Sequence, residues 1–407
     1  MQKDSLESAS RQKAAGVQRL APQLAMFRRM RRNNLVVVAL ALMLILCTAA
    51  VPPVRAHLQA LAILKLSSGQ PLPWLLAKMV AEPVTTEPLE YAGSAGVIHA
   101  RIYRPARHPN APGMIVLHGV HHLGMDEPRL KSFAAAMASC GLQVLTPELP
   151  GIQEYRIDRS SVGVIGESAN WFAKRTGSPV GVMGLSFSGG LALVAASDPV
   201  YGPSFKFVFA VGAQDAMDHV AQFYLTGAEK RPDGTVERLQ AHEYGALVLE
   251  YEHLEDFVPA ADVEAIRPVL RQHLYEDKVA EKAAAATLTE VQRREAAALM
   301  DSGSAETLAK LAAADTRHIA EMDGLSPHGK LAGLTTPVFL LHGEADNIIP
   351  AAETLWMASE LNSKTLRAVL VSPVLSHLDV DGSRPGVMDE WRLVHFFALV
   401  MEEARKN

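Results

Sequence analysis

The chain has 407 residues, of which 49% are hydrophobic and 20% charged, and its formal net charge is −5. This balance is typical of a folded protein with a large core and excludes a disordered chain. A sequence pI near 6.3 gives no overall basic surface, so we expect no nucleic-acid partner. The only cysteines are Cys47 and Cys140, and we expect no disulfide framework. Without paired cysteine spacing or a His-Glu-x-x-His motif, the sequence also predicts no metal site.

The N-terminal region has the pattern of a membrane anchor. Residues 1–34 are polar and basic, and residues 35–51 form an uncharged apolar run. That run is at the short end of the ~17–25 residues that a bilayer-spanning helix requires. Eight Lys and Arg residues precede it, against three in residues 52–80. This bias predicts a cytoplasmic tail (1–34), an uncleaved signal-anchor helix (35–51) in the lipid bilayer, and an extracytoplasmic domain.

Two alternatives stay open in this region. Small residues at 48–50 and 54–56 would also suit a cleavage site, in which case the run is a signal peptide and the protein is secreted. The length of the basic lead favours the uncleaved anchor. Residues 52–82 form a juxtamembrane segment, and their apolar part (58–80) is expected either to lie on the membrane surface or to pack against the domain that follows.

From residue 83 onward the sequence alternates between strand and helix patterns. A half-exposed strand is predicted over residues 97–103, and a continuous apolar run predicts a buried strand over 113–117. Alternation of this kind implies a mainly parallel sheet with helices on both faces, the α/β class. Further strands are predicted at 142–147, 179–184, 205–211, 337–341 and 366–371, and helices at 127–141, 161–174, 187–196, 351–361 and 387–404.

The alternation stops between residues 213 and 334. This segment is rich in Ala, Glu, Arg and Leu and predicts several helices. An insertion of that size between two core strands is interpreted as a helical cap, so the domain over residues 83–407 is interrupted by a cap at 213–334. Within it, the acidic run over residues 250–256 is interpreted as a solvated helix face.

The strongest motif lies at residues 180–190. An apolar strand runs directly into Gly184-Leu185-Ser186, which small residues and a helix follow. A nucleophile elbow needs this arrangement, because the serine sits in a strained turn whose neighbours must be small. Ser188 stands where the usual motif has its last glycine and is an alternative nucleophile. Ser186 is preferred because Gly184 ends the strand directly before it.

Three motifs at other predicted strand ends complete a pattern. The strand at 337–341 is followed by His-Gly-x-x-Asp, which ends at Asp346, and His377 follows the last predicted strand. Upstream, His118-Gly119-Val120 follows the strand at 113–117. His118 and His342, each in a His-Gly pair, are expected to be structural, whereas His121 and His122 would line the pocket.

In this order the motifs resemble the α/β-hydrolase family, including its esterase-like and dienelactone-hydrolase-like members. The resemblance implies that Ser186 is the nucleophile, Asp346 the triad acid and His377 the base. It also implies an oxyanion hole formed by the backbone N–H groups of Val120 and Phe187. Dienelactone hydrolases carry a cysteine where this chain has Ser186, which is a departure from that branch.

The expected function is hydrolysis of a small-molecule carboxylic ester or related acyl bond through an acyl-enzyme on Ser186, without a cofactor. A lactonase and a serine peptidase of the same fold are the alternatives within the enzyme class. A catalytically silent, membrane-tethered binding module is the alternative from another class.

Overall fold

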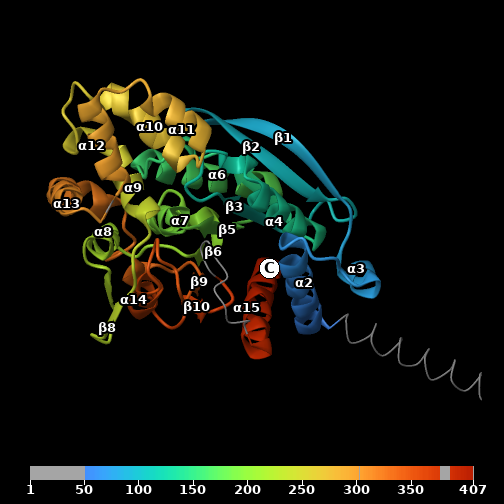
Figure 1. Ribbon diagram of the computed structural model, residues 1–407. Helices are drawn as coiled ribbons and strands as arrows, with labels where there is room; N and C mark the ends of the chain where they lie inside the picture. The colour runs from blue at the N-terminus through green and yellow to red at the C-terminus, as the bar shows by residue number, and fades with distance from the viewer. Residues whose placement is uncertain (1–50, 302, 376–385, 407) are drawn as a thin grey trace, which may run out of the picture. The chain divides into compact units, whose positions relative to one another are not determined.

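The computed structural model of the protein describes residues 51–301, 303–375 and 386–406 (Figure 1). The predicted cytoplasmic tail, the predicted membrane helix up to residue 50, and His377 lie outside the described residues. Within the described ranges, none of the helices combines the length and the apolar character that crossing a bilayer requires.

A single large sheet of eight strands has the order β1-β2-β4-β3-β5-β6-β9-β10. β1 pairs antiparallel with β2 and β2 pairs antiparallel with β4, whereas the pairings from β4 to β10 are parallel. The prediction of a mainly parallel sheet is therefore confirmed. The strands are β1 (Val84–Gly93), β2 (Gly96–Pro105), β3 (Gly113–Leu117), β4 (Gln143–Pro147), β5 (Val180–Leu185), β6 (Phe205–Val211), β9 (Val338–Gly343) and β10 (Leu366–Ser372).

Helices cover both faces of this sheet, because successive side chains of a strand point to opposite sides. In β3, Ile115 and Leu117 belong to one apolar core, which α6 and α7 share. Met114 and Val116 belong to a second core, which α4 and α15 share. The helices of the α/β layers are α4 (Pro128–Ser139), α5 (Pro150–Gln153), α6 (Arg159–Thr176), α7 (Phe187–Ser197), α14 (Ala352–Glu360) and α15 (Val387–Arg405).

Two helices precede the sheet in the chain, α2 (Pro52–Ser67) and α3 (Trp74–Val80). Ala56, Ala60 and Ile63, at the spacing of one helix face, are fully buried in the second core. Figure 1 shows α2 beside α15, and the rings of His57 and Trp391 stack with centroids 5.4 Å apart. Of the two alternatives for this stretch, the burial corresponds to packing on the domain.

The segment between β6 and β9 forms a group of helices, coloured from yellow-green to orange in Figure 1. A small hairpin, which the sequence did not predict, lies between α8 and α9. Its three-residue strands are too short to show an alternating pattern. The elements are α8 (Met217–Thr226), β7 (Ala228–Lys230), β8 (Val236–Arg238), α9 (Glu243–Glu252), α10 (Val263–Leu274), α11 (Lys278–Ala285), α12 (Glu290–Met300) and α13 (Ala305–Leu325).

The interpretation of the acidic run at 250–256 as a solvated face was wrong for Glu250, whereas Glu255 is exposed. Glu250 is completely buried, and neither of its carboxylate oxygens has a hydrogen-bond partner among the described residues. Burial raises the pKa of Glu250 to about 8. Glu250 is buried because its helix, α9, packs against α8, α10 and α12. Charge alone did not reveal this burial.

Candidate active site

Ser186 occupies the turn between β5 and α7. Its backbone has φ 56° and ψ −136°, and its N–H donates to the carbonyl of Val211 on the neighbouring strand β6 at 2.8 Å. A positive φ on a residue with a β-carbon costs about 1–3 kcal/mol and persists only where the surroundings enforce it. The turn leaves the half-buried Ser186 at the N-terminus of α7, where the helix dipole favours negative charge. This is the strained strand–turn–helix that the motif predicts.

The small residues around Ser186 are required by close backbone contacts. A β-carbon on Gly184 would lie 2.5 Å from the carbonyl oxygen of Ser188, and one on Gly189 would lie 2.8 Å from the β-carbon of Ala213. Ser188 is fully buried, and its hydroxyl donates to the carbonyl of His118 at 2.5 Å. Ser188 therefore holds the loop after β3, which leaves Ser186 as the more accessible hydroxyl of the two.

The loop after β3 lies directly against Ser186. A β-carbon on Gly119 would be 3.5 Å from the β-carbon of Ser186. Among the described residues, neither the N–H of Val120 nor that of Phe187 has a hydrogen-bond acceptor. For Phe187 this is expected, because the first N–H groups of a helix have no intrahelical partner. The two groups that the family resemblance assigns to an oxyanion hole are thus available donors.

His118 has the structural role that the sequence analysis expected. Its Nδ1 donates to the carbonyl of Gly119 at 2.9 Å, and its Nε2 accepts the N–H of Leu149 at 3.0 Å. Burial lowers the pKa of His118 to about 4, so the ring is neutral near pH 7. The imidazole fixes the loop that carries Val120.

Asp346 lies three residues after β9 and is 3% exposed. Its Oδ1 accepts the backbone N–H groups of Ile348 and Ile349 at 3.0 and 3.1 Å. Its Oδ2 is 3.6 Å from Nε2 of His342 and would be 3.3 Å from a β-carbon on Gly212, which follows β6. Since β6 lies between β5 and β9, the turn that carries Ser186 and the loop that carries Asp346 occupy the same edge of the sheet.

His342 holds the loop that carries Asp346, called the acid loop. It is fully buried; its Nε2 donates to the carbonyl of Ile349 at 2.8 Å, and its Nδ1 accepts the hydroxyl of Thr354 at 2.7 Å. The two ring nitrogens therefore tie the loop to α14, which is the structural role expected of His342.

The third predicted triad residue, His377, lies outside the described residues. The described chain reaches Leu375, whose carbonyl oxygen would be 2.6 Å from a β-carbon on Gly343, three residues before Asp346. The structure thus brings together the strand ends that carry Ser186, Val120 and Asp346, and it follows the chain to within two residues of His377.

The start of α9 contacts both loops of the candidate site, which sequence reasoning missed. The backbone N–H of His242 donates to the carbonyl of Asn347 at 2.8 Å, next to Asp346. The hydroxyl of Tyr244 donates to the carbonyl of Val120 at 3.1 Å. These partners are more than a hundred residues apart in sequence, so no local pattern could have linked them.

Aromatic side chains gather where the cap meets the loop after β3. The ring of His122 stacks on that of His121, with centroids 4.6 Å apart, and on that of Tyr275 from the cap, at 4.3 Å. Burial lowers the pKa of His121. Both histidines therefore lie in the contact between loop and cap.

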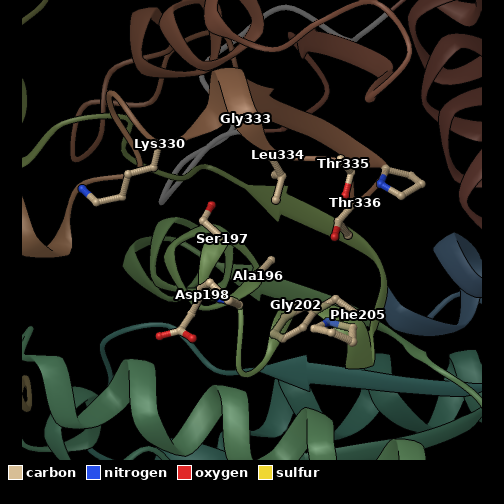
Figure 2. Close-up of a pocket in the computed structure, with 13 residues that line it drawn as sticks. Ala196, Ser197, Asp198, Gly202, Phe205, Lys330, Gly333, Leu334, Thr335 and Thr336 are labelled. Carbon is tan, nitrogen blue, oxygen red and sulfur yellow. The ribbon is translucent and has the colours of Figure 1, made fainter.

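Figure 2 shows a pocket whose lining includes neither Ser186 nor Asp346. Phe205 and Pro337, which border the amino ends of β6 and β9, line it together with Asp198, Lys330 and Thr336. Ser186 follows the carboxyl end of β5, which runs parallel to β6. The pocket is therefore at the opposite edge of the sheet and does not belong to the candidate active site.

The arrangement of sheet, helices and serine turn decides the fold. A mainly parallel sheet with helices on both faces carries a positive-φ serine after a central strand, and Asp346 follows a later strand at the same edge. The chain has the α/β-hydrolase fold. The helices α8 to α13 lie between β6 and β9, in the segment where the sequence predicts a cap.

Comparisons with known proteins give matches among solved structures at low sequence identity. No protein-family model matches the chain, and no curated protein matches its sequence. Among solved structures, the chain is similar to brefeldin A esterase, a bacterial homologue of human hormone-sensitive lipase, with TM-score 0.44 and 15% identity over 85% of this chain and 82% of that one. For an acylaminoacyl peptidase of Pyrococcus horikoshii the values are 0.42 and 13%, over 74% of this chain and 39% of that one.

Proposed function

We propose that the protein is a serine hydrolase that cleaves a carboxylic ester or a related acyl bond. The observation that carries this proposal is the position of Ser186, in a positive-φ turn at a helix N-terminus, beside the available N–H groups of Val120 and Phe187. A hydroxyl at such a turn can reach a carbonyl carbon while two amide N–H groups donate hydrogen bonds to the developing oxyanion.

The reaction would proceed in two steps. The oxygen of Ser186 attacks the carbonyl carbon while His377 takes its proton, and the negative charge on the carbonyl oxygen is stabilised by the two amides. His377 then donates that proton to the leaving alkoxide, and the acyl-enzyme forms. Water, deprotonated by His377, attacks the acyl group, and the proton returns to Ser186. Asp346 would orient the imidazole and stabilise its cation without taking the proton.

The contacts of the cap favour a small substrate over a polypeptide. α9 is hydrogen-bonded to the loop of Val120 and to the loop of Asp346, so it lies beside both sides of the candidate site. A helix held at that position restricts access for a long chain, whereas a small ester would need only a narrow approach. We therefore rank ester hydrolysis above peptide hydrolysis; a lactone, being a cyclic ester, would fit the same chemistry.

The test is labelling of the protein by a fluorophosphonate probe together with turnover of p-nitrophenyl esters of increasing acyl length. We expect covalent labelling and ester hydrolysis, with lactone and peptide substrates as the comparison. A folded protein that neither reacts with the probe nor hydrolyses any of these esters would instead support the silent binding module.

We further propose that residues 35–51 anchor the protein in a membrane, with residues 1–34 in the cytoplasm. The support is the apolar run and the charge bias around it. Reporter fusions after residue 80 should show an active exported phosphatase and no fluorescence from a protein that matures only in the cytoplasm. A fluorescent fusion would reverse the orientation, and soluble mature protein starting near residue 57 would identify a cleaved signal peptide.

A further inference from the structure

Both ends of the cap insertion meet at one group of carboxylate and imidazole side chains. Asp215 lies four residues after β6, and His328 lies three residues after α13. The backbone N–H of His328 donates to the carbonyl of Asp215 at 3.0 Å, and Nδ1 of His328 is 2.9 Å from Oδ2 of Asp215. Oε2 of Glu360, the last residue of α14, is 3.9 Å from the same Nδ1. We call these three residues, with His219 and Glu353, the cap-base cluster.

The cap-base cluster brings three carboxylates, two of them buried, together with two imidazoles. Asp215 is completely buried, and its Oδ1 has no hydrogen-bond partner among the described residues. Glu353 is 2% exposed and accepts the backbone N–H of Asp215 at 2.8 Å, so the two buried carboxylates are close neighbours. His219 approaches Glu353, with Nδ1 3.3 Å from Oε1. A buried carboxylate oxygen without a partner is costly, and a cation beside it would offset that cost.

The spacing of the donor atoms suits a tetrahedral metal ion. One donor atom each from Asp215, His328 and Glu360 lies within 4.8 Å of the other two. Bonds of about 2.0–2.2 Å in a tetrahedral zinc site place neighbouring ligand atoms roughly 3.3–3.6 Å apart. The separations of 2.9 and 3.9 Å about Nδ1 of His328 lie on either side of that range.

We propose that Asp215, His328 and Glu360 bind a divalent transition-metal ion, with Zn²⁺ as the best match to one imidazole and two carboxylates. An imidazole donor disfavours Ca²⁺ and Mg²⁺, which prefer oxygen ligands throughout. The side chain of His328 is 53% exposed, which gives the ion a route from solvent. On binding, Nδ1 of His328 coordinates as the neutral imidazole and any proton on it passes to solvent.

The site would be structural, because it fastens three separate parts of the fold. Asp215 begins the cap, His328 ends it, and Glu360 belongs to α14 of the sheet-bearing part. A bound ion would tie both cap ends to that helix. The inference is independent of the proposed hydrolysis and revises the sequence-based expectation of no metal site, which considered only ligands close together in sequence.

A second group of possible ligands, His253, His318 and Glu321 in the cap, serves as the comparison. The rings of His253 and His318 are stacked with centroids 3.7 Å apart and planes 16° apart. Lone pairs in nearly parallel, stacked rings do not converge on one point. In addition, Nε2 of His318 is hydrogen-bonded to Asp256 at 2.6 Å. This group is the poorer site and supplies a matched control variant.

The experiment uses the full chain carrying Ser186→Ala, freed of metal with a chelator and titrated with ZnCl₂ by calorimetry near pH 7.5. We expect a site saturated well below about 100 µM zinc and an increase in Tm on binding. His328→Asn should weaken the binding at least tenfold and remove the increase in Tm, whereas His318→Asn should change neither. Glu360→Gln keeps an oxygen to accept the N–H groups of Leu331 and Ala332 but loses the acceptor of the Gly329 N–H. We expect it to weaken zinc binding without unfolding α14.

Three results would overturn the proposal. They are the absence of binding at about 100 µM zinc, equal binding by His328→Asn and the parent chain, and loss of binding in His318→Asn. If His328→Asn fails to fold, the Glu360→Gln variant decides between the outcomes. Because the parent chain has no nucleophile at position 186, none of these results depends on whether the protein is an esterase.

Discussion

Replacing Ser186 with alanine should lower kcat for ester hydrolysis by roughly 10⁴–10⁶-fold and abolish labelling by fluorophosphonate probes. The residual rate would come from the oxyanion donors and substrate binding, which the substitution leaves in place. The fold should be preserved, because the hydroxyl of Ser186 does not cap α7. Turnover and labelling, measured beside thermal unfolding of the same samples, separate loss of the nucleophile from loss of structure.

Ser188→Ala is the matched control for this experiment. It removes the hydrogen bond from the Ser188 hydroxyl to the carbonyl of His118 and leaves that carbonyl without this donor. We expect a stability loss of about 1–3 kcal/mol with labelling retained. An active Ser186→Ala protein paired with an unlabelled Ser188→Ala protein would place the nucleophile two residues later and refute the assignment.

Asp346→Asn and His377→Ala should each lower kcat by several orders of magnitude, roughly 10⁴-fold for a misoriented imidazole. Asparagine at 346 keeps a carbonyl oxygen that can accept the N–H groups of Ile348 and Ile349, so the acid loop should stay folded. The double variant should be no slower than His377→Ala alone, because members of a triad act as a unit. Steady-state kinetics on one ester tests this, and losses that multiply across the two positions would show that the residues do not cooperate.

The local structure of the candidate site could be predicted from the sequence because the required residue types are adjacent there. Gly184 lies near the end of one apolar strand, and Ser186 and Gly189 follow that strand. The close contacts around Gly184 and Gly189 explain why small residues stand there. β6 was predicted at its exact bounds, since a fully apolar run leaves little ambiguity. β1 was not predicted as a strand, because it is mostly exposed and lacks a regular alternation of buried and exposed residues.

What the sequence could not indicate depends on contacts across the cap. The hydroxyl of Tyr244 reaches Val120 across 124 positions, and Asp215 meets His328 across 113. Glu250 looked like part of a charged surface, yet neighbouring helices bury it completely. Residue type and spacing describe one segment at a time, whereas these features arise only when distant segments pack together.

The two hydrogen bonds made by the start of α9 link access to reactivity. If α9 swung away as a rigid unit to admit substrate, the bonds from His242 to Asn347 and from Tyr244 to Val120 would break together. The loop that carries Val120 and the loop that carries Asp346 would then each lose a hydrogen bond at the same moment. The protein would thus be inactive while α9 was displaced, and the proposed reaction would begin only after α9 had returned. Water that entered while α9 was displaced would meet an acyl-enzyme without the support of these two hydrogen bonds. Hydrolysis of the proposed acyl-enzyme would then occur only after α9 had returned.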